Sequence, residues 1–231
     1  MLPLVGGALA GLAGTLAWGA RSRSSQLFAP SVWHGDRGRR VLALTFDDGP
    51  SESTPELLEL LDRWKVPATF FCLGAQVRRL PGVARAIAAG GHEIGNHSDS
   101  HARLWLRSPA FITNELTRAQ ETIEEITGRR PALFRAPFGV RWFGLKEAQA
   151  KLGLLGVMWS VIGRDWVLDG PAVAQRISRV GNGDIICLHD ARELAPNPDI
   201  RPTLEAVRLA VPMLLEQGFR FETVSDICQK H

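Results

Sequence analysis

The sequence lacks several features that mark common protein classes. Its three cysteines are an odd number without metal-ligand spacing, so neither a disulfide framework nor a zinc knuckle is indicated. The net charge is only +3, and its Lys and Arg residues are scattered, which argues against a nucleic-acid partner. No polar linker, internal repeat or low-complexity segment divides the 231 residues. Because 45% of them are hydrophobic, we expect one sizeable folded domain.

The N-terminal segment differs from the rest of the chain. Leu2–Trp18 carries no charge and precedes Arg21 and Arg23, which predicts a signal peptide or membrane anchor over residues 1–20. The basic n-region of a secretory signal is missing, so we favour an anchor. A buried apolar helix at the start of the fold is the alternative, because this uncharged run is near the short limit for a span. Residues 21–40 are polar and irregular and are predicted to form a tether.

The folded domain, predicted over residues 41–231, alternates strand and helix patterns. Apolar and β-branched runs predict seven strands: Val41–Asp47, Ala68–Leu73, His92–Asn96, Ala132–Arg135, Leu154–Val161, Asp184–His189 and Arg220–Val224. Apolar residues at helical spacing predict six helices: Thr54–Lys65, Pro81–Ala89, Pro109–Thr127, Leu145–Leu152, Pro171–Val180 and Thr203–Gln217. Such alternation is typical of parallel α/β folds. No G-x-G-x-x-G follows the first strand, so we favour a distorted (β/α)7-type barrel over an open doubly wound sheet.

Polar residues gather where the predicted strands end, which is where parallel α/β folds carry their active sites. The first strand ends in Asp47 and Asp48, although Asp-Asp-Gly-Pro is also good turn material. His97 and His101 follow the third strand with a spacing that puts both on one face of a helical turn. Two histidines with a carboxylate from another strand make a three-ligand metal site, and Asp48 is the natural third ligand.

Nitrogen and oxygen ligands of this kind fit zinc or another first-row divalent ion better than calcium or an iron–sulfur cluster. Such an ion polarises a carbonyl and makes hydroxide available near neutral pH. Asp47 is then free to act as general base, and His189 at the end of the sixth strand could protonate a leaving group.

Five short motifs carry a resemblance to a known family. TFDDG, HSDSH, RAPFG, RDW and CLHD occur in the order and spacing of the motifs of the polysaccharide deacetylases, carbohydrate esterase family four. The chain resembles this family from about Val41 to Ile227. The resemblance implies a distorted (β/α) barrel with a divalent ion, usually zinc although cobalt or another first-row ion is possible. The implied ligands are Asp48, His97 and His101.

The resemblance also implies roles for the residues around the ion. Asp47 looks like the catalytic base, oriented by Arg135, and His189 looks like the general acid for the leaving amine, tuned by Asp165. The backbone N–H of Phe138, together with the metal, would stabilise the oxyanion. These roles agree with physical chemistry, since an Arg keeps a neighbouring carboxylate ionised and an Asp favours the imidazolium form of a neighbouring His.

Trp166 would wall the substrate groove, and three positions depart from the family pattern. Phe138 stands where Tyr is usual, in a chain without any Tyr, and a backbone contact should tolerate this change. Ile162 replaces an Asp that often contacts the groove. Cys187 stands where a Leu commonly lines the acetyl pocket, so the pocket is either wider or simply tolerates the change.

The function that these features predict is a metal-dependent hydrolase that removes an N-acyl group from an amino sugar. The substrate would be a glycan such as peptidoglycan or chitin oligomers, reached by a membrane-anchored or secreted enzyme outside the cytoplasm. One alternative is a deformylase or deacetylase of a lipid-linked amino sugar. Another is a catalytically silent glycan-binding module, and a third is hydrolysis of an ester or a non-sugar amide. The sequence predicts membrane association through the N-terminal segment and no nucleic-acid partner.

Overall fold

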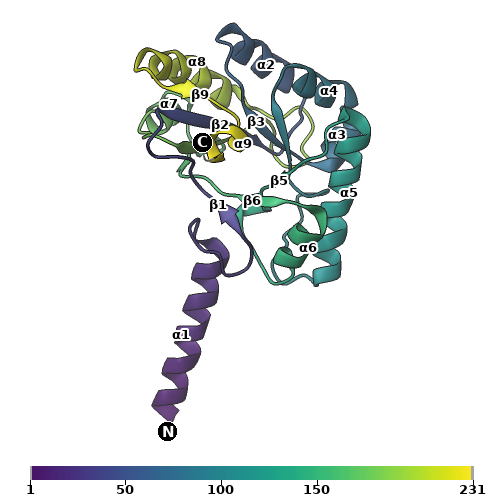
Figure 1. The fold of residues 1–231 in the computed structure, drawn as a ribbon, viewed down its shortest axis with the longest axis vertical. Helices are drawn as coiled ribbons and strands as arrows, with labels where there is room; N and C mark the ends of the chain where they lie inside the picture. The colour runs from purple at the N-terminus through teal and green to yellow at the C-terminus, as the bar shows by residue number, and fades with distance from the viewer. Residues whose placement is uncertain (1, 230–231) are drawn as a thin grey trace.

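The computed structural model describes residues 2–229 and alternates strands and helices along most of the chain (Figure 1). The strands are β1 (Ser31–Val32), β2 (Val41–Asp47), β3 (Thr69–Cys72), β4 (Glu93–Asn96), β5 (Leu133–Phe134), β6 (Leu155–Val157), β7 (Val161–Ile162), β8 (Asp184–His189) and β9 (Arg220–Phe221). The helices are α1 (Leu2–Arg21), α2 (Thr54–Arg63), α3 (Gly74–Arg79), α4 (Pro81–Ala89), α5 (Pro109–Thr127), η1 (Pro137–Gly139), α6 (Leu145–Leu152), α7 (Gly170–Ile177), α8 (Arg201–Glu216) and α9 (Val224–Cys228).

The strands pair in parallel in the order β1-β6-β5-β4-β3-β2-β8-β7, with β9 beside β2. Strands β6 and β7 follow each other in the chain but lie toward opposite edges of this sheet. Residues 158–160 join them: the amide of Met158 donates to the carbonyl of Val32 (2.7 Å), and that of Ser160 donates to the carbonyl of Ile185 (3.0 Å). The sheet therefore curls until its edges approach each other. This confirms the predicted distorted barrel of parallel strands.

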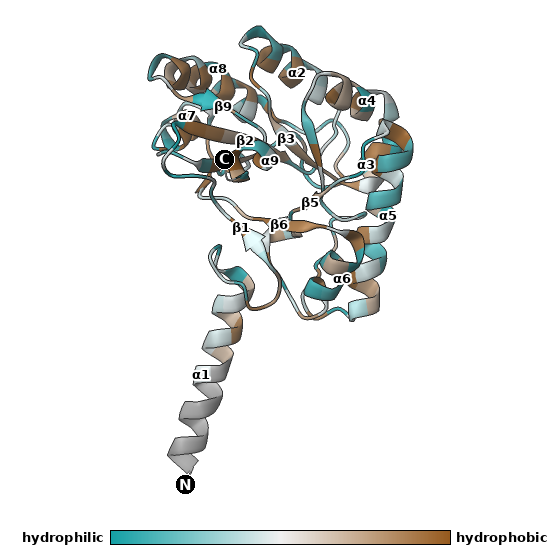
Figure 2. Cartoon of the chain, viewed as in Figure 1, coloured by the Kyte–Doolittle hydropathy of each residue, from teal (hydrophilic) through white to brown (hydrophobic). Residues whose placement is uncertain are grey.

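Strand β2 pairs with β3, β8 and β9 and is largely hydrophobic (Figure 2). All seven of its residues are buried. Its side chains alternate between two faces, as a strand requires. Leu42 and Phe46 belong to the large apolar core that also contains residues of α2 and α8. Val41 and Ala43 belong to a smaller apolar cluster on the other face. Asp47 continues this second face, so its carboxylate points to the inner side of the curled sheet.

Two predicted strands differ from the observed ones. Leu154–Val161 is two strands, because the chain crosses from β6 at one side of the sheet to β7 at the other. Arg220–Val224 shortens to β9, because Thr223 starts helix α9 by accepting a hydrogen bond from the amide of Asp226. Helix α3 was not predicted. All three differences concern segments too short to show a hydrophobic period.

The segment predicted to be a tether contacts the sheet and its loops. Strand β1 pairs with β6, and the buried Arg141 holds the residues before it. The guanidinium of Arg141 donates to the carbonyls of Ser22 and Ser25 and to the hydroxyl of Ser31 (2.6 Å). Much of the stretch between residues 22 and 32 is thus fastened to the loop that contains Arg141.

Helix α1 extends away from the sheet, and its C-terminal end lies near β1 (Figure 1). Ala20 is buried there against Phe28 and Val140, whereas Trp18 is exposed. Within residues 2–229, no helix combines the length and the apolar character that crossing a membrane requires. The membrane anchor stays a prediction.

Candidate active site

A cavity of about 740 Å³ opens at the carboxyl ends of the strands. Because all strand pairs are parallel, the loops that follow them meet at this end of the sheet. Eight of the predicted site residues line the cavity: Asp47, Asp48, His97, His101, Phe138, Trp166, Cys187 and His189. The other two, Arg135 and Asp165, are buried and hydrogen-bonded to members of this set.

Asp47 is held by an arginine that is completely buried. The Nη1 group of Arg135 donates to Oδ1 of Asp47 and to Oγ1 of Thr45, both at 2.7 Å. The same guanidinium donates to the carbonyls of Val157 and Met158, and it stacks over the ring of Phe71 at 4.1 Å. Arg135 thus fixes the position of the Asp47 carboxylate and supplies it with a positive charge.

The backbone of Arg135 also orients one of the predicted metal ligands. Its carbonyl accepts a hydrogen bond from Nδ1 of His97 (2.8 Å), which fixes the tautomer and leaves the lone pair on Nε2. A backbone carbonyl behind a histidine is a usual partner of metal-ligating imidazoles. One residue therefore positions both the predicted base and a predicted ligand.

Asp48 begins the turn after β2 in a left-handed conformation with φ of 76°. Non-glycine residues rarely adopt such backbone angles, which cluster at functional sites. Its Oδ2 accepts a hydrogen bond from the amide of Glu193 (2.9 Å), whereas Oδ1 is buried and has no hydrogen-bond partner in residues 2–229. Oδ1 lies 3.3 Å from Nε2 of His97 and 3.2 Å from Nε2 of His101.

The two histidines meet through a loop and not through the predicted helical turn. Ser98 and His101 both have positive φ angles, which turn the chain back on itself. The side chain of Asp99 holds this loop in place, with two hydrogen bonds from Arg78 (2.7 and 3.0 Å) and an ion pair with Arg118. The spacing of four residues therefore indicated two histidines that do lie together, whereas the predicted helical turn between them was wrong.

The protonation of this group suits a cation. Burial would raise the pKa of Asp48, but the close approach of His97, followed by the charges of His189 and His101, holds it well below its usual range. Burial, followed by the charge of His97, lowers the pKa of His101 to about 4. One ionised carboxylate and a neutral imidazole thus face each other, as metal binding requires. Ligand atoms of Asp48, His97 and His101 lie within 4.8 Å of one another.

The predicted acid lies on the other side of the cavity. Nδ1 of His189 lies 2.9 Å from Oδ1 of Asp165, and the amide of His189 donates to Oδ2 of the same carboxylate (2.9 Å). Burial lowers the pKa of His189, but the hydrogen bond and charge of Asp165, with the charges of Asp48 and Asp47, raise it to about 9. His189 can therefore hold a proton at neutral pH.

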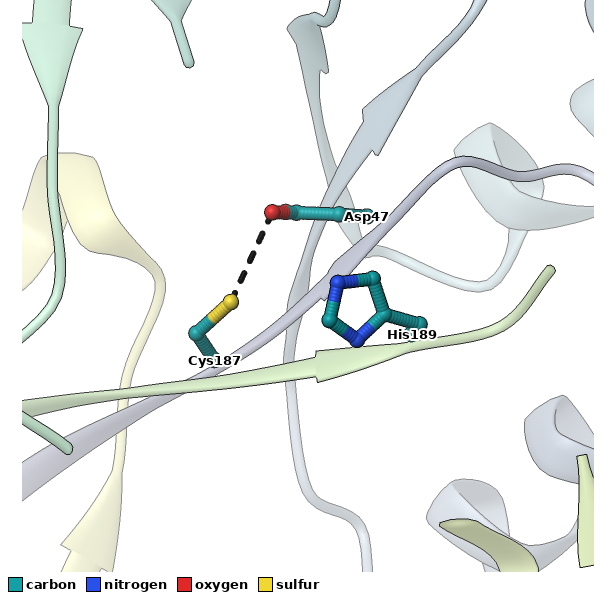
Figure 3. A group of neighbouring side chains, drawn as sticks. All are labelled: Asp47, Cys187 and His189. Atoms are coloured by element: carbon teal, nitrogen blue, oxygen red, sulfur yellow. Dashed lines mark hydrogen bonds between the residues drawn. The ribbon is translucent and has the colours of Figure 1, made fainter. Parts of the chain in front are cut away.

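Cys187 lies two residues before His189 on β8, so the two side chains share a face of the strand. Its thiol donates to Oδ2 of Asp47 at 3.5 Å (Figure 3). The predicted position of Cys187 at the cavity wall is thus observed, with an additional contact to the base. Ile162, the other departure in this region, also lines the cavity.

Aromatic side chains form the rim of the cavity. Phe138 is 46% exposed and has a φ of 59°, and its ring lies 4.5 Å from that of His101. Trp105 packs edge-on against Phe138, a contact that the sequence did not reveal. Trp166 is also 46% exposed and meets the ring of His189 edge-on at 5.1 Å. The cavity thus has two exposed aromatic rings at its mouth, Phe138 beside His101 and Trp166 beside His189.

Several residues around the site were missed by sequence reasoning. Thr203, from the start of α8, donates to Oδ2 of Asp165 (2.6 Å), and Arg192 pairs with the same carboxylate. Asp190 is buried and accepts from Thr54, and a Cβ at Gly49 would come within 2.1 Å of its carboxylate. Of these residues, only Asp190 could have been identified from the sequence, because it directly follows His189, the predicted acid.

Comparisons with known proteins agree with this geometry. A family model described as polysaccharide deacetylase matches residues 34–157. A chitooligosaccharide deacetylase from Bradyrhizobium sp. (strain ANU 289) is 34% identical, and the match covers 87% of this chain and 97% of that protein. A peptidoglycan-N-acetylglucosamine deacetylase from Bacillus cereus is 33% identical, with coverage of 87% and 94%.

Solved structures extend the comparison to the fold. A family 4 acetyl xylan esterase from Clostridium thermocellum, in complex with a cobalt ion, superimposes with a TM-score of 0.73 and 32% identity, covering 81% of this chain and 89% of that one. A family 4 pseudoenzyme from Bacillus anthracis superimposes with a TM-score of 0.77 and 26% identity, covering 87% and 69%. Since the same fold occurs in a pseudoenzyme, an assignment of activity has to rest on the residues of the cavity.

Proposed function

The chain belongs to the polysaccharide deacetylase family, and on that premise we propose that it is a metal-dependent hydrolase that removes the N-acetyl group from an amino sugar in a glycan. Peptidoglycan and chitin oligomers are the proposed substrates, because relatives of similar length carry those names. Membership of this family confirms the predicted enzyme class, a hydrolase of the polysaccharide deacetylase type.

One observation carries the proposal. The buried Oδ1 of Asp48, unpartnered among the described residues, faces Nε2 of both His97 and His101 in the cavity that also contains the arginine-bound Asp47. A buried anionic oxygen without a hydrogen bond is costly, and a cation would remove that cost. The donor set of one carboxylate and two imidazoles fits zinc, cobalt or a similar first-row ion. When bound, such an ion polarises the acyl carbonyl and acidifies water.

The remaining residues divide the proton transfers between them. Asp47, positioned by Arg135, accepts a proton from the attacking water. His189, kept protonated by Asp165, donates a proton to the leaving amine. The backbone N–H of Phe138 is the proposed donor to the oxyanion, and Trp166 the proposed wall of the sugar groove. Cys187 borders the space for the acyl group.

We also propose that the reaction takes place outside the cytoplasm, because the named substrates of the two relatives are extracellular polymers or their fragments. The apolar run before residue 20 is the proposed means of reaching that location, as an anchor or as a signal. A lipid-linked amino sugar remains the alternative substrate, and an acetyl ester is a further one because a structural neighbour is named an acetyl xylan esterase.

The test is a product assay over a panel of acylated substrates. Metal-free protein is given zinc or cobalt, and acetate release is measured from chitooligosaccharides, peptidoglycan, an acetylated xylan and a lipid-linked N-acetyl amino sugar. We expect release from the amino-sugar glycans that depends on the added metal. Release only from the xylan or only from the lipid-linked sugar would transfer the assignment to that substrate. A metal-loaded protein that turns over none of them would contradict the proposed hydrolase activity and favour the catalytically silent glycan-binding module.

A further inference from the structure

Three side chains that can ligate a metal form a second group in the cavity. Ligand atoms of Asp47, Cys187 and His189 lie within 4.8 Å of one another, and this group shares no member with the Asp48 set. The register of the sheet explains the arrangement, because Asp47 on β2 pairs directly with His189 on β8, and Thr45 with Cys187. All three side chains come from the adjacent strands β2 and β8 and point toward the same space (Figure 3).

We propose that Asp47, Cys187 and His189 form a second, inhibitory site for a thiophilic divalent cation such as zinc or cadmium. The inference goes beyond the proposed function, which needs only the Asp48 site. A thiolate, an imidazole and a carboxylate are three ligand types that zinc accepts, and a water could complete the tetrahedron. The thiolate would favour zinc, cobalt and cadmium over magnesium or calcium.

The surroundings leave one free ligand atom on each residue. Arg135 occupies Oδ1 of Asp47, and the contact from the Cys187 thiol goes to Oδ2. Asp165 occupies Nδ1 of His189, which leaves Nε2 for a cation. A carboxylate behind the histidine is the arrangement that orients metal-ligating imidazoles in proteins.

The proton balance sets the order in which the two sites fill. Binding at the second site breaks the S–H bond of Cys187, forms a metal–sulfur bond and releases the proton to solvent, and a protonated His189 releases a second proton. The Cys187 thiol is buried and donates to Oδ2 of Asp47, so removal of its proton also breaks this hydrogen bond, whereas the Asp48 site has no thiol proton to lose. The Asp48 site therefore fills first and the second site only at higher metal concentration.

Occupation of the second site would stop turnover under the proposed function, because it engages the base and the acid together. This consequence rests on the proposed function, whereas the binding itself does not. The two are therefore tested separately, by a titration that needs no activity and by a rate measurement.

The titration uses the full chain freed of metal, with cobalt as the probe. The wild type should bind two equivalents, and the second should produce the thiolate-to-cobalt charge-transfer absorption that the first lacks. Cys187→Ala should bind one equivalent without that band. Cys228→Ser is the matched control, because it removes a half-buried thiol of α9 and should keep both equivalents and the band. A thermal melt of each variant confirms that it folds, and Cys187→Val replaces Cys187→Ala if the latter does not.

A wild type that takes up a single equivalent, or a Cys187 variant that retains the band, would overturn the second site. In the rate measurement, each protein is compared with its own rate at one equivalent of zinc. The rate should fall with excess zinc in the wild type and in Cys228→Ser, and stay constant in Cys187→Ala. Equal inhibition of all three would assign the effect to another site. If no protein turns over, the proposed function fails while the cobalt result stands by itself.

Discussion

The two halves of the cavity differ in how their polar atoms are satisfied. In the half formed by Asp48, His97 and His101, Oδ1 of Asp48 and Nδ1 of His101 lack hydrogen-bond partners within residues 2–229. In the other half, Asp47 is held by Arg135 and His189 by Asp165. We call these the ligand half and the proton-transfer half. A cation would compensate the buried Oδ1 of Asp48 in the ligand half, whereas the carboxylates of the proton-transfer half already have partners.

The backbone shows the same difference. Asp48 and His101 both have positive φ angles, at 76° and 55°, whereas Asp47 and His189 belong to regular strands. Strained positions persist only where surrounding contacts hold them, and here the Asp99 pairs supply such contacts. Regular strands thus carry the residues proposed to transfer protons, and braced loops carry the residues proposed to hold the metal.

The largest expected effect comes from breaking the ligand half. His97→Ala removes one of three proposed ligands, so we expect loss of bound metal and of activity. Metal analysis of the purified variant, together with acetate release, measures both effects. His92→Ala is a matched control, because His92 is a partly buried histidine of the same region that does not line the cavity. A His97→Ala protein that binds one equivalent as tightly as the wild type would contradict the ligand assignment.

Breaking the proton-transfer half should leave the metal in place. Asp47→Asn keeps the shape of the side chain and removes its basic oxygen, so the rate should fall by about 10²–10⁴-fold. Metal content at one equivalent should equal that of the wild type. Asp62→Asn is the matched control, because it makes the same substitution on the exposed face of α2 and should leave the rate unchanged. Full activity in Asp47→Asn would show that another group is the base.

A smaller effect is expected from a substitution that tests the role of Asp165. The Asp165 carboxylate raises the pKa of His189 to about 9, so the protonated acid should persist into the alkaline range. Asp165→Asn removes that charge, and the alkaline limb of the rate profile should move down toward the ordinary histidine value of about 6.5. A bound divalent cation lowers the pKa of His189, and with it the alkaline limb, in both proteins. The alkaline limb of Asp165→Asn should still lie at a lower pH than that of the wild type.

The same shift predicts a stability effect with a defined sign. A histidine whose pKa is raised on folding stabilises the protein fully below about pH 6.5 and loses this contribution as the pH rises through about 9. Thermal melts of wild type and Asp165→Asn should therefore differ most at acidic to neutral pH, and the difference should shrink above pH 9 to the part contributed by Thr203 and Arg192. A difference between the two proteins that grows with pH would contradict the raised pKa.

The smallest effect is expected at the rim. Phe138→Tyr adds a hydroxyl to a ring that is 46% exposed, so the added group can reach water. Because the proposed oxyanion contact is the backbone N–H, the rate at saturating substrate should change little. A measurement of kcat and KM separates an effect on the reaction from an effect on sugar binding. A large fall in kcat with unchanged KM would mean that the ring itself takes part.

Much of the fold followed from the periodicity of the sequence. Long helices such as α5, with Ser108 as its N-cap and Gly128 at its end, were predicted within one or two residues. The two-residue strands β1 and β7 were not predicted as separate strands, because they are too short to carry a period and are defined by their neighbours. The residues that Arg141 holds were predicted to be a tether because their hydrogen-bond partner is more than 100 residues away in the chain, where no local pattern reveals it.

The sequence by itself determined which residues could do chemistry, because strand ends of a parallel fold must meet and the five motifs lie at those ends. It also identified Asp47 and Asp48 as a pair at the end of β2. It predicted different roles for the two, but only the tertiary structure gave their positions: the alternation of β2 points Asp47 inward to Arg135, and the left-handed Asp48 turns toward His97 and His101. The tertiary structure also brought Cys187 to Asp47. Such contacts depend on the register between β2 and β8, which no local pattern in the chain encodes.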